Sequence, residues 1–264
     1  SNFLKQRLKR SLGRAVAVVS IEKSGKQLVL GEVDLHDAAL DVIEVGTLAC
    51  RVDRINSASR RHIITIEDPI EFVYPRSRGL VRQREVGTDT RSFAEALRHA
   101  LREDPDVILI GEMRDPETIA LALTASETGH LCLSTLHTID AAQSVERIVD
   151  VFAPHQQAQV RAQLAGALKG VLSQSLLPRQ DTPGRIAARE LMIVNAAVSN
   201  LIREGKTHMI PTAIETGGAL GMYTLDRSLA ALVRRGAVSY EDALARAQDP
   251  KRFTDACRKV GATV

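Results

Sequence analysis

Three polar segments, each directly after a run of apolar residues, carry side chains that suit phosphate chemistry. They are residues 67–71, 111–115 and 134–138, which follow the apolar runs 63–66, 107–110 and 131–133. If these runs are parallel strands, their carboxyl ends meet at one edge of a sheet, where ligands bind. A carboxylate there can hold a magnesium-bound water or orient an attacking water, and an imidazole can polarise a terminal phosphate.

A simpler interpretation is that acidic residues after strands only cap the next helix, as we expect of Asp115 before Pro116. Because three successive segments carry suitable groups, we favour a functional site over capping alone. His130 and His137 lie on either side of the third apolar run. Seven residues at about 3.3 Å each would separate them by about 23 Å in an extended strand, so they cannot share a metal ion.

Apolar runs alternate with amphipathic stretches through the middle of the chain, which indicates an α/β fold with a mostly parallel sheet. Ser92 and Glu95 form a capping box ahead of a predicted helix that Pro105 ends. After one more strand, at 186–194, the pattern becomes helical and predicts a small helical region. The remaining predicted helices are 116–128, 141–151, 156–177, 196–204, 207–215, 225–235, 240–248 and 250–260, and residues 178–184 resemble a linker.

The composition excludes several classes of protein. Of 264 residues, 44% are hydrophobic and 25% charged, which is typical of a globular chain and excludes disorder and a disulfide scaffold. The net charge of +3 is too small to imply a polyanionic partner. We interpret the one basic stripe as a solvated or intersubunit face and expect no nucleic-acid partner. The stripe is Arg82, Arg84, Arg91, Arg98 and Arg102.

The cysteine and terminal patterns bear on the cellular compartment. Cys50, Cys132 and Cys257 form no CxxC pair, so we expect no structural zinc and a reducing compartment. Residues 1–14 contain five basic residues and no acid. We interpret them as a solvated arm, with a membrane-surface or partner helix as the alternative.

Four segments match, in order, the motifs of one ATPase family. Residues 64–72 are similar to its Asp box, 106–115 to its Walker B segment, 129–138 to its His box, and 197–204 to a helix motif of its retraction branch. On these motifs, the chain from Arg54 to about Ala247 resembles the type IV pilus retraction ATPases. These are PilT-like members of the type II/IV secretion ATPase superfamily. The resemblance implies a RecA-like P-loop NTPase core that binds ATP and Mg²⁺.

The resemblance also implies roles for individual residues. Glu71 would activate water, Glu112 would be the Walker B carboxylate near Mg²⁺, and His137 would lie near the terminal phosphate. The other implied nucleotide-site residues are Glu67, Asp68, Arg114, His130 and Thr135.

At the level of the whole protein, the resemblance implies a hexameric ring of identical subunits at the cytoplasmic base of a pilus machine. The ring would be peripheral to the inner membrane rather than inserted, and would dock on a platform protein there. We expect an atypical segment at 1–46, the NTPase core at 47–195 and a C-terminal helical domain at 196–264.

The sequence departs from the family in one respect. A phosphate loop of the form Gly-x4-Gly-Lys-Ser/Thr should end just before Thr47, but Glu44 stands where the lysine belongs. A carboxylate there would repel phosphate. Gly25-Lys26 and Gly205-Lys206-Thr207 lack the full motif. We expect residues 28–30 to form the first strand, with 32–44 as an irregular insert before a helix at 47–56.

Two explanations of residues 1–46 stay open: a fragment or reading-frame slip, and a diverged subunit. Three functions follow from the pattern. The first is an ATP-hydrolysing retraction motor, the second is a non-hydrolysing ring or adaptor subunit of the same machinery, and the third is a nucleic-acid motor with a related core.

Overall fold

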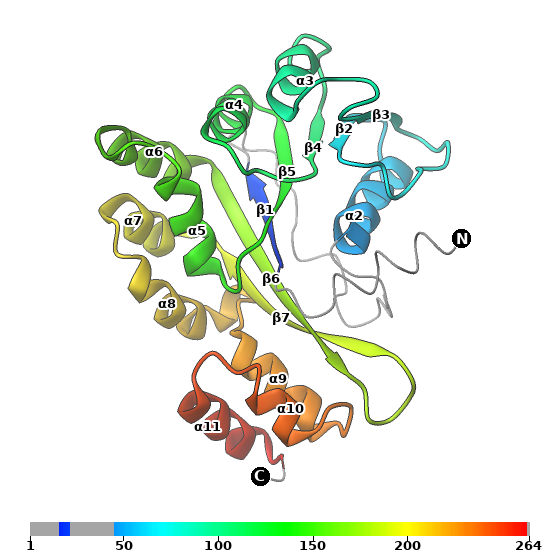
Figure 1. The fold of residues 1–264 in the computed structure, drawn as a ribbon. Coiled ribbons are helices and arrows are strands. Elements are labelled where there is room, and N and C mark those ends of the chain that lie inside the picture. Colours follow the sequence, from blue (N-terminus) through cyan, green and yellow to red (C-terminus); the bar gives the residue numbers. More distant parts are fainter. Residues whose placement is uncertain (1–15, 22–44, 263–264) are drawn as a thin grey trace.

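A seven-stranded sheet forms the centre of the computed structural model, which describes residues 16–21 and 45–262 (Figure 1). Its strand order is β3-β2-β4-β5-β1-β6-β7. The strands are β1 (Val16–Ile21), β2 (His62–Glu67), β3 (Leu80–Glu85), β4 (Val107–Ile110), β5 (Leu131–Leu136), β6 (Leu168–Pro178) and β7 (Arg185–Ile193). Strands β3, β2, β4 and β5 are parallel, whereas β1, β6 and β7 pair antiparallel with their neighbours. The predicted α/β class with a parallel sheet is confirmed, and its antiparallel half is a feature that the sequence did not indicate.

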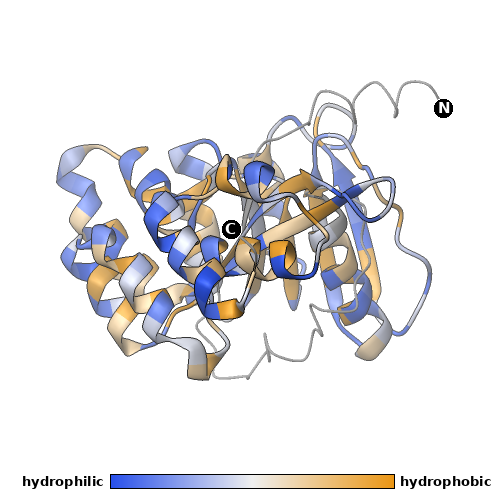
Figure 2. Ribbon diagram, turned by 90° about the horizontal axis from the view of Figure 1, so that it is seen from below, coloured by the Kyte–Doolittle hydropathy of each residue, from blue (hydrophilic) through white to orange (hydrophobic). Residues whose placement is uncertain are grey.

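Helices cover both faces of the sheet, which explains why the central strands are apolar without alternation. On one face, Ile64, Ile108 and Cys132 pack against helices α3 to α8. On the other face, Ile63, Leu109 and other strand residues pack against α2. The helices are α2 (Val45–Ala58), α3 (Phe93–Ala100), α4 (Pro116–Glu127), α5 (Ala141–Asp150), α6 (Pro154–Ala167), α7 (Ala196–Glu204) and α8 (Ile210–Thr216). Figure 2 shows hydrophobic and hydrophilic residues alternating along them, as expected of helices that bury one side.

The predicted helix starts are confirmed by their caps. The side chain of Ser92 accepts a hydrogen bond from the backbone N–H of Glu95 at 3.1 Å and caps α3. Asp115 accepts from the N–H of Thr118 at 2.8 Å and caps α4, with Pro116 in the first turn. Such caps satisfy backbone donors that the helix itself leaves free, so short polar signals locate helix starts well.

The prediction of one long helix at 156–177 is wrong. Helix α6 ends at Ala167, and the chain continues directly as β6 between β1 and β7. Nearly every β6 side chain is buried, so the strand is covered on both faces, and periodicity alone cannot distinguish such a run from a buried helix. Residues 178–184 are consequently no linker but the connection of the antiparallel pair β6 and β7.

Two further strands were missed. β3 is a parallel edge strand whose sequence, LVRQRE, was taken for part of a basic face. The first strand is β1, which lies between β5 and β6, whereas we expected residues 28–30 to form the first strand. Those residues, the predicted insert at 32–44, the arm at 1–14 and Glu44 lie outside the described residues, whereas the predicted helix at 47–56 lies within α2.

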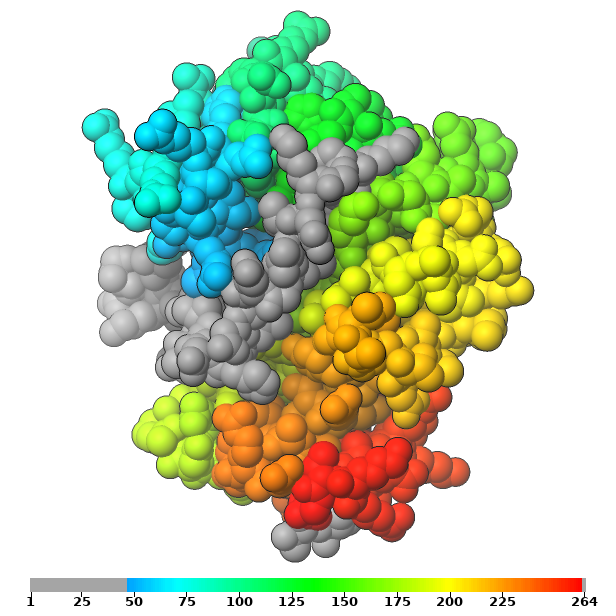
Figure 3. Space-filling view, turned by 180° about the vertical axis from the view of Figure 1, so that it is seen from behind, coloured from blue at the N-terminus to red at the C-terminus, as the bar shows by residue number. Residues whose placement is uncertain are grey.

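The last three helices form a second hydrophobic core with the β6–β7 pair. They are α9 (Leu225–Arg234), α10 (Tyr240–Leu244) and α11 (Pro250–Val260). Phe253, Leu229 and Cys257 pack there against Leu177 and Ala188 of the two strands. Figure 3 shows these helices at one end of the molecule. We call α9–α11 the C-terminal unit. By contrast, α7 and α8 pack in the core of the sheet. The second hydrophobic core therefore takes up the chain only after Thr224. The predicted domain boundary at residue 196 stays a prediction.

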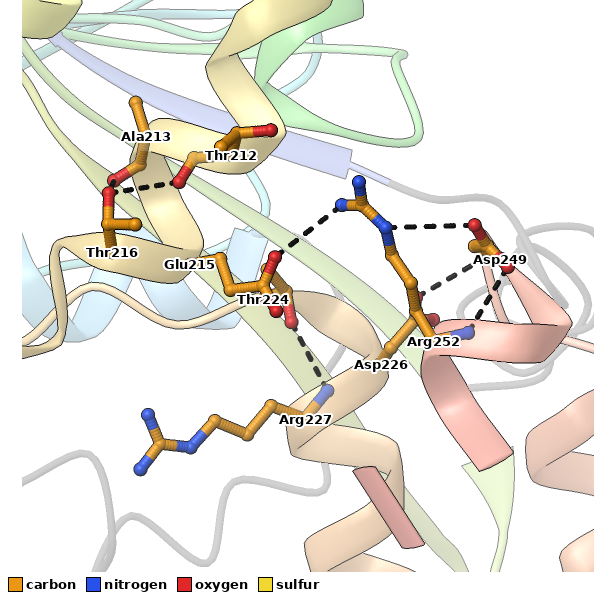
Figure 4. Close-up of polar contacts among 9 residues, drawn as sticks. All are labelled: Thr212, Ala213, Glu215, Thr216, Thr224, Asp226, Arg227, Asp249 and Arg252. Atoms are coloured by element: carbon orange, nitrogen blue, oxygen red, sulfur yellow. Dashed lines mark hydrogen bonds and ion pairs between the residues drawn. The ribbon is translucent and has the colours of Figure 1, made fainter. Parts of the chain in front are cut away.

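Polar contacts attach the C-terminal unit to the rest of the chain (Figure 4). The guanidinium of Arg252 on α11 lies 3.8 Å from the carboxylate of Glu215 on α8 and 3.7 Å from that of Asp249. Asp226 on α9 accepts hydrogen bonds from the backbone N–H groups of Gln248 and Asp249 at 2.9 and 3.4 Å. Asp226 therefore fixes the start of α11 against α9.

We predict that Phe253→Ala lowers the free energy of unfolding by about 3–5 kcal/mol, because the ring is fully buried at the centre of the second core. Urea unfolding followed by circular dichroism measures the change. The matched control is Phe72→Ala, since that ring is 41% exposed, and we expect it to cost less than half as much. Equal losses in the two variants would contradict the described packing.

Candidate functional site

The carboxyl ends of β2, β4 and β5 meet in register at one edge of the sheet. Ile66 pairs with Ile110, and Ile110 with Ser134. One residue further on, the N–H of Gly111 donates to the carbonyl of Ile66 at 2.8 Å, and the hydroxyl of Thr135 donates to the carbonyl of Gly111 at 2.5 Å. The predicted meeting of the three polar segments is confirmed at the level of the backbone.

Glu112 is the centre of the side-chain cluster at this edge. Its Oε2 atom lies 2.6 Å from a guanidinium nitrogen of Arg114 and 3.5 Å from Nε2 of His137. The Glu112 side chain is 18% exposed, whereas Arg114 is 69% exposed. Water screens the exposed arginine, so this ion pair contributes little to stability. The Glu112 carboxylate is therefore mostly shielded from water, with an imidazole and a guanidinium beside it.

Glu67 lies in the same row but is held inside the sheet. Its Oε1 atom accepts from the hydroxyl of Thr65 at 2.6 Å and from the amide of Gln83 at 3.1 Å. The side chain is 6% exposed. Burial and the nearby Glu67 carboxylate raise the pKa of Tyr74. Glu67 thus organises the interior beside the site.

The predicted catalytic carboxylate, Glu71, and its neighbour Asp68 are exposed. Among the residues that the structure describes, neither side chain makes a hydrogen bond or an ion pair. Their loop is held instead by two residues of β3 that the sequence analysis missed. The amide of Gln83 donates to the carbonyl of Phe72 at 2.8 Å, and Glu85 accepts from the N–H of Ile70 at 3.0 Å. The alternation of Val81, Gln83 and Glu85 along one strand was the signal that could have found them.

His130 does not join the cluster within one chain. It directly precedes β5, at the opposite edge of the sheet from His137, which directly follows β5. Its Nδ1 atom lies 2.9 Å from the carbonyl of Ala125 and 3.1 Å from the hydroxyl of Thr128. These contacts place His130 at the end of α4, beside the carbonyl of Ala125.

Strand β1 runs away from the site. Ala17 pairs with Leu136 at the carboxyl end of β5, and Ile21 pairs with Cys132 near its amino end. A phosphate loop directly after β1 would therefore lie at the wrong edge. The first turn of α2 is nevertheless at the site's edge, because the hydroxyl of Thr47 donates to Oε1 of Gln174 at 3.2 Å, and Gln174 pairs with Val16 at the start of β1.

A buried carboxylate lies beside the loop that carries His137. Glu190 of β7 is 2% exposed, and its Oε1 atom accepts from the N–H of Ala141, the first residue of α5, at 3.0 Å. Burial raises the pKa of Glu190 to about 7, with smaller upward contributions from Asp140 and Asp226. Burial likewise raises the pKa values of Asp140 and Asp226.

Three of the five arginines in the basic stripe have acidic partners. Arg82 and Arg84 contact Glu103, and Arg98 contacts Glu117. A paired face of this kind fits the interpretation of a solvated surface. Within 16–21 and 45–262, no helix has the length and apolar character needed to cross a membrane. The same residues contain no cluster of three or more His, Cys, Asp or Glu side chains that could hold a metal ion.

Comparison with protein families identifies a family. A family model described as "Type II/IV secretion system protein" matches residues 46–198. A curated relative, "Type IV pilus retractation ATPase PilT" of Pseudomonas aeruginosa, is 54% identical over 207 residues, which are 78% of this chain and 60% of the relative. The "Twitching motility protein" of Neisseria gonorrhoeae is 55% identical over 208 residues, 79% of this chain and 56% of the relative. The chain thus spans little more than half the length of these relatives.

Solved structures give the same grouping. The structure titled "Crystal Structure of the Pilus Retraction Motor PilT and Bound ADP" superposes with a TM-score of 0.74 at 48% identity, covering 80% of this chain and 60% of that one. The Legionella pneumophila ATPase DotB gives 0.69 at 28% identity, covering 76% and 56%. The predicted fold class is confirmed by these similarities.

We predict a pH dependence of stability that originates at Glu190. Its pKa is raised from 4.5 to about 7 in the folded chain, so the folded state binds a proton that the unfolded state releases. The contribution of Glu190 to the free energy of unfolding is fully present below about pH 4.5 and is lost as the pH rises through 7. The total loss is roughly 3 kcal/mol. Unfolding free energies at pH 5 and pH 8 measure this loss.

Glu190→Gln should reduce the difference in unfolding free energy between pH 5 and pH 8. Part of this pH-dependent difference should remain in the variant, because Asp140 and Asp226 are still present and have raised pKa values. Glu204→Gln is the control, since that carboxylate is exposed and its pKa is lowered. A wild-type stability that does not fall between these pH values would contradict the burial of a titrating Glu190.

Proposed function

The chain belongs to the type II/IV secretion system protein family, and from this premise we propose that it is a subunit of an ATP-hydrolysing pilus-retraction motor. The observation that carries the proposal is the convergence of Glu112 and His137 at the carboxyl edge of three parallel strands. The names of its relatives, a pilus retraction ATPase and a twitching motility protein, support the same class of motor.

The described residues fit part of a magnesium–nucleotide site. Glu112 offers hard carboxylate oxygens, which Mg²⁺ prefers as ligands, directly or through water. The imidazole of His137 stands beside that carboxylate and can donate a hydrogen bond to a phosphate oxygen. When bound, Mg²⁺ would neutralise charge that develops on the phosphates.

We assign the remaining residues to positions around this centre. Arg114, which is largely exposed, supports Glu112 or reaches a neighbouring subunit. Thr135 fixes the backbone at Gly111. Glu71 and Asp68 are exposed on the loop after β2, so Glu71 can act on water only once the nucleotide is bound. Glu67 holds this loop through Gln83, and His130 serves the site from the far edge, at a subunit boundary.

A second function, a ring or adaptor subunit that does not hydrolyse ATP, is favoured by one specific observation. The sequence contains no complete phosphate-loop motif, and β1 runs antiparallel to β5, away from Glu112. Backbone N–H groups of a phosphate loop normally hold the β- and γ-phosphates, and its lysine compensates their charge. A subunit without this loop would keep the site's shape and lose most of its affinity for ATP.

Under either function we propose assembly into a hexameric ring of this chain. The ring would dock on an inner-membrane platform protein, on the cytoplasmic side and peripheral to the membrane. The domain limits at 47–195 and 196–264 belong to the same proposal, and nucleic acid has no part in it.

We predict that the chain binds Mg-ATP in the micromolar range by calorimetry and hydrolyses it. Glu112→Gln keeps the shape of the side chain but removes the charge, so we expect kcat to fall about 100-fold or more. A phosphate-release assay measures the rate.

The matched control is Glu117→Gln. This carboxylate lies five residues away, is exposed and pairs with Arg98 on the neighbouring helix, so kcat should stay within about twofold. Retained turnover in Glu112→Gln would contradict the assigned role of Glu112. No binding at millimolar ATP by folded wild-type chain of correct mass would exclude the motor and leave the non-hydrolysing subunit.

A further inference from the structure

The residues on either side of Glu71 are held by side chains of strand β3. Before it, the backbone N–H of Ile70 donates to Oε2 of Glu85 at 3.0 Å. After it, the carbonyl of Phe72 accepts from the side-chain amide of Gln83 at 2.8 Å. A residue whose two neighbours are both fixed has little freedom in its own backbone. These two contacts therefore determine where the backbone of Glu71 lies.

Gln83 makes the larger share of the contacts to this loop. Its Nε2 atom donates to Oε1 of Glu67 at 3.1 Å as well as to the carbonyl of Phe72, and its Oε1 atom accepts from the N–H of Tyr74 at 3.3 Å. The partners determine the orientation of the amide, because Nε2 meets two acceptors and Oε1 meets a donor. Gln83 therefore joins the end of β2 to two points of the loop.

The far end of the loop is anchored in the hydrophobic core. Tyr74 packs against the core on the α2 face of the sheet, and its ring lies edge-on to that of Phe72 with 5.0 Å between the centroids. The register of β3 pairs Glu85 with Glu67, the last residue of β2. Side chains two residues apart share one face of a strand. β3 thus presents Gln83 and Glu85 to the loop together.

The side chain of Glu71 contrasts with this fixed backbone. It is exposed and forms no hydrogen bond or ion pair with any residue that the structure describes. A free carboxylate on a fixed backbone can meet a reacting group in one position, because little of its alignment has to be achieved when the ligand binds.

We propose that Gln83 and Glu85 are positioning residues, which hold the backbone of Glu71 in place so that its carboxylate can act on water. For catalysis this inference rests on the proposed function, in which Glu71 activates water. The order of the loop is a property of the folded chain and can be measured without nucleotide.

The first test is hydrogen exchange of the unaltered chain followed by NMR. The amides of Ile70 and Tyr74 donate to the two β3 side chains. Their protection factors should be at least about tenfold higher than those of Glu71 and Val73. These two amides are the references, because they lie in the same loop and donate to no residue that the structure describes. Equal protection of all four amides would overturn the proposal before any variant is made.

The second test removes the hydrogen bonds of the two side chains separately. Gln83→Met keeps an unbranched side chain of similar length but has no amide, so the protection of the Tyr74 amide should fall about tenfold. Glu85→Met should have the same effect on the Ile70 amide. In both variants the NMR order parameter of the Glu71 amide should fall from about 0.85, which is typical of a rigid backbone, to below about 0.6.

Arg82→Met is the matched control. Arg82 precedes Gln83 on the same strand, so its side chain lies on the opposite face of β3, and its guanidinium contacts Glu103 at 3.5 Å. The control should leave the order parameter of Glu71 and the protection of the loop amides unchanged. If Gln83→Met and Glu85→Met lower only the global stability and leave Glu71 as ordered as before, the proposal fails.

The catalytic part is tested by combining variants. In a chain that hydrolyses ATP, Gln83→Met should lower kcat about tenfold or more while KM for ATP stays within about twofold. Because Gln83 acts through Glu71, adding Gln83→Met to Glu71→Gln should lower kcat by no more than about a further twofold. Reductions that multiply would show that Gln83 acts independently of Glu71 and would overturn the assignment.

The same measurements separate this proposal from the proposed function. If the wild-type chain does not hydrolyse ATP, the motor function fails. The exchange rates and order parameters then still decide whether β3 holds the backbone of Glu71.

Discussion

The close approach of β2 and β4 at Gly111 is the contact on which the site depends. The N–H of Gly111 donates to Ile66, its carbonyl accepts the hydroxyl of Thr135, and so it joins three strands at the point where they end. A Cβ atom at this position would lie 3.2 Å from the carbonyl oxygen of Ile66. That oxygen belongs to a central strand and cannot move aside. Glu112 follows one residue later, so the register at Gly111 sets where its carboxylate lies relative to His137.

Capping carboxylates extend this order from the sheet to the end of the chain. Asp115 caps α4, Asp140 caps α5 while Glu190 accepts from the N–H of Ala141, and Asp226 and Asp249 together hold the start of α11. Exposed caps such as Asp249 contribute modestly and independently. Glu190 is different because it is buried, so its loss would leave the N–H of Ala141 without this acceptor inside the protein.

The sequence predicted those parts of the fold whose signals are local. Helices 196–204 and 250–260 match α7 and α11 to the residue, because each begins at a polar cap and ends at a glycine in the left-handed conformation. β6 was taken for a helix because it is a buried strand whose place is set by its neighbours β1 and β7, which local sequence does not reveal. For the same reason Gln83, Glu85 and Glu190 were missed: their partners lie on other elements. Glu112 and His137 were found because each ends a strand, whereas the isolated position of His130 follows simply from which end of β5 it occupies.

A nucleotide site of this kind has an acidic edge and a phosphate-binding loop, and the two have different structural requirements. The acidic edge needs only the parallel register of β2, β4 and β5, which is intact. Phosphate binding by a loop needs a strand that ends at this same edge and leads into a helix, and β1 ends at the opposite edge. Yet Thr47 and Gln174 keep the first turn of α2 at the acidic edge, where backbone N–H groups and the positive end of the helix dipole favour an anion. Nucleotide binding by this chain therefore depends on the start of α2. The carboxylates at the acidic edge can order the site, but they cannot replace the positive charge of a phosphate-loop lysine.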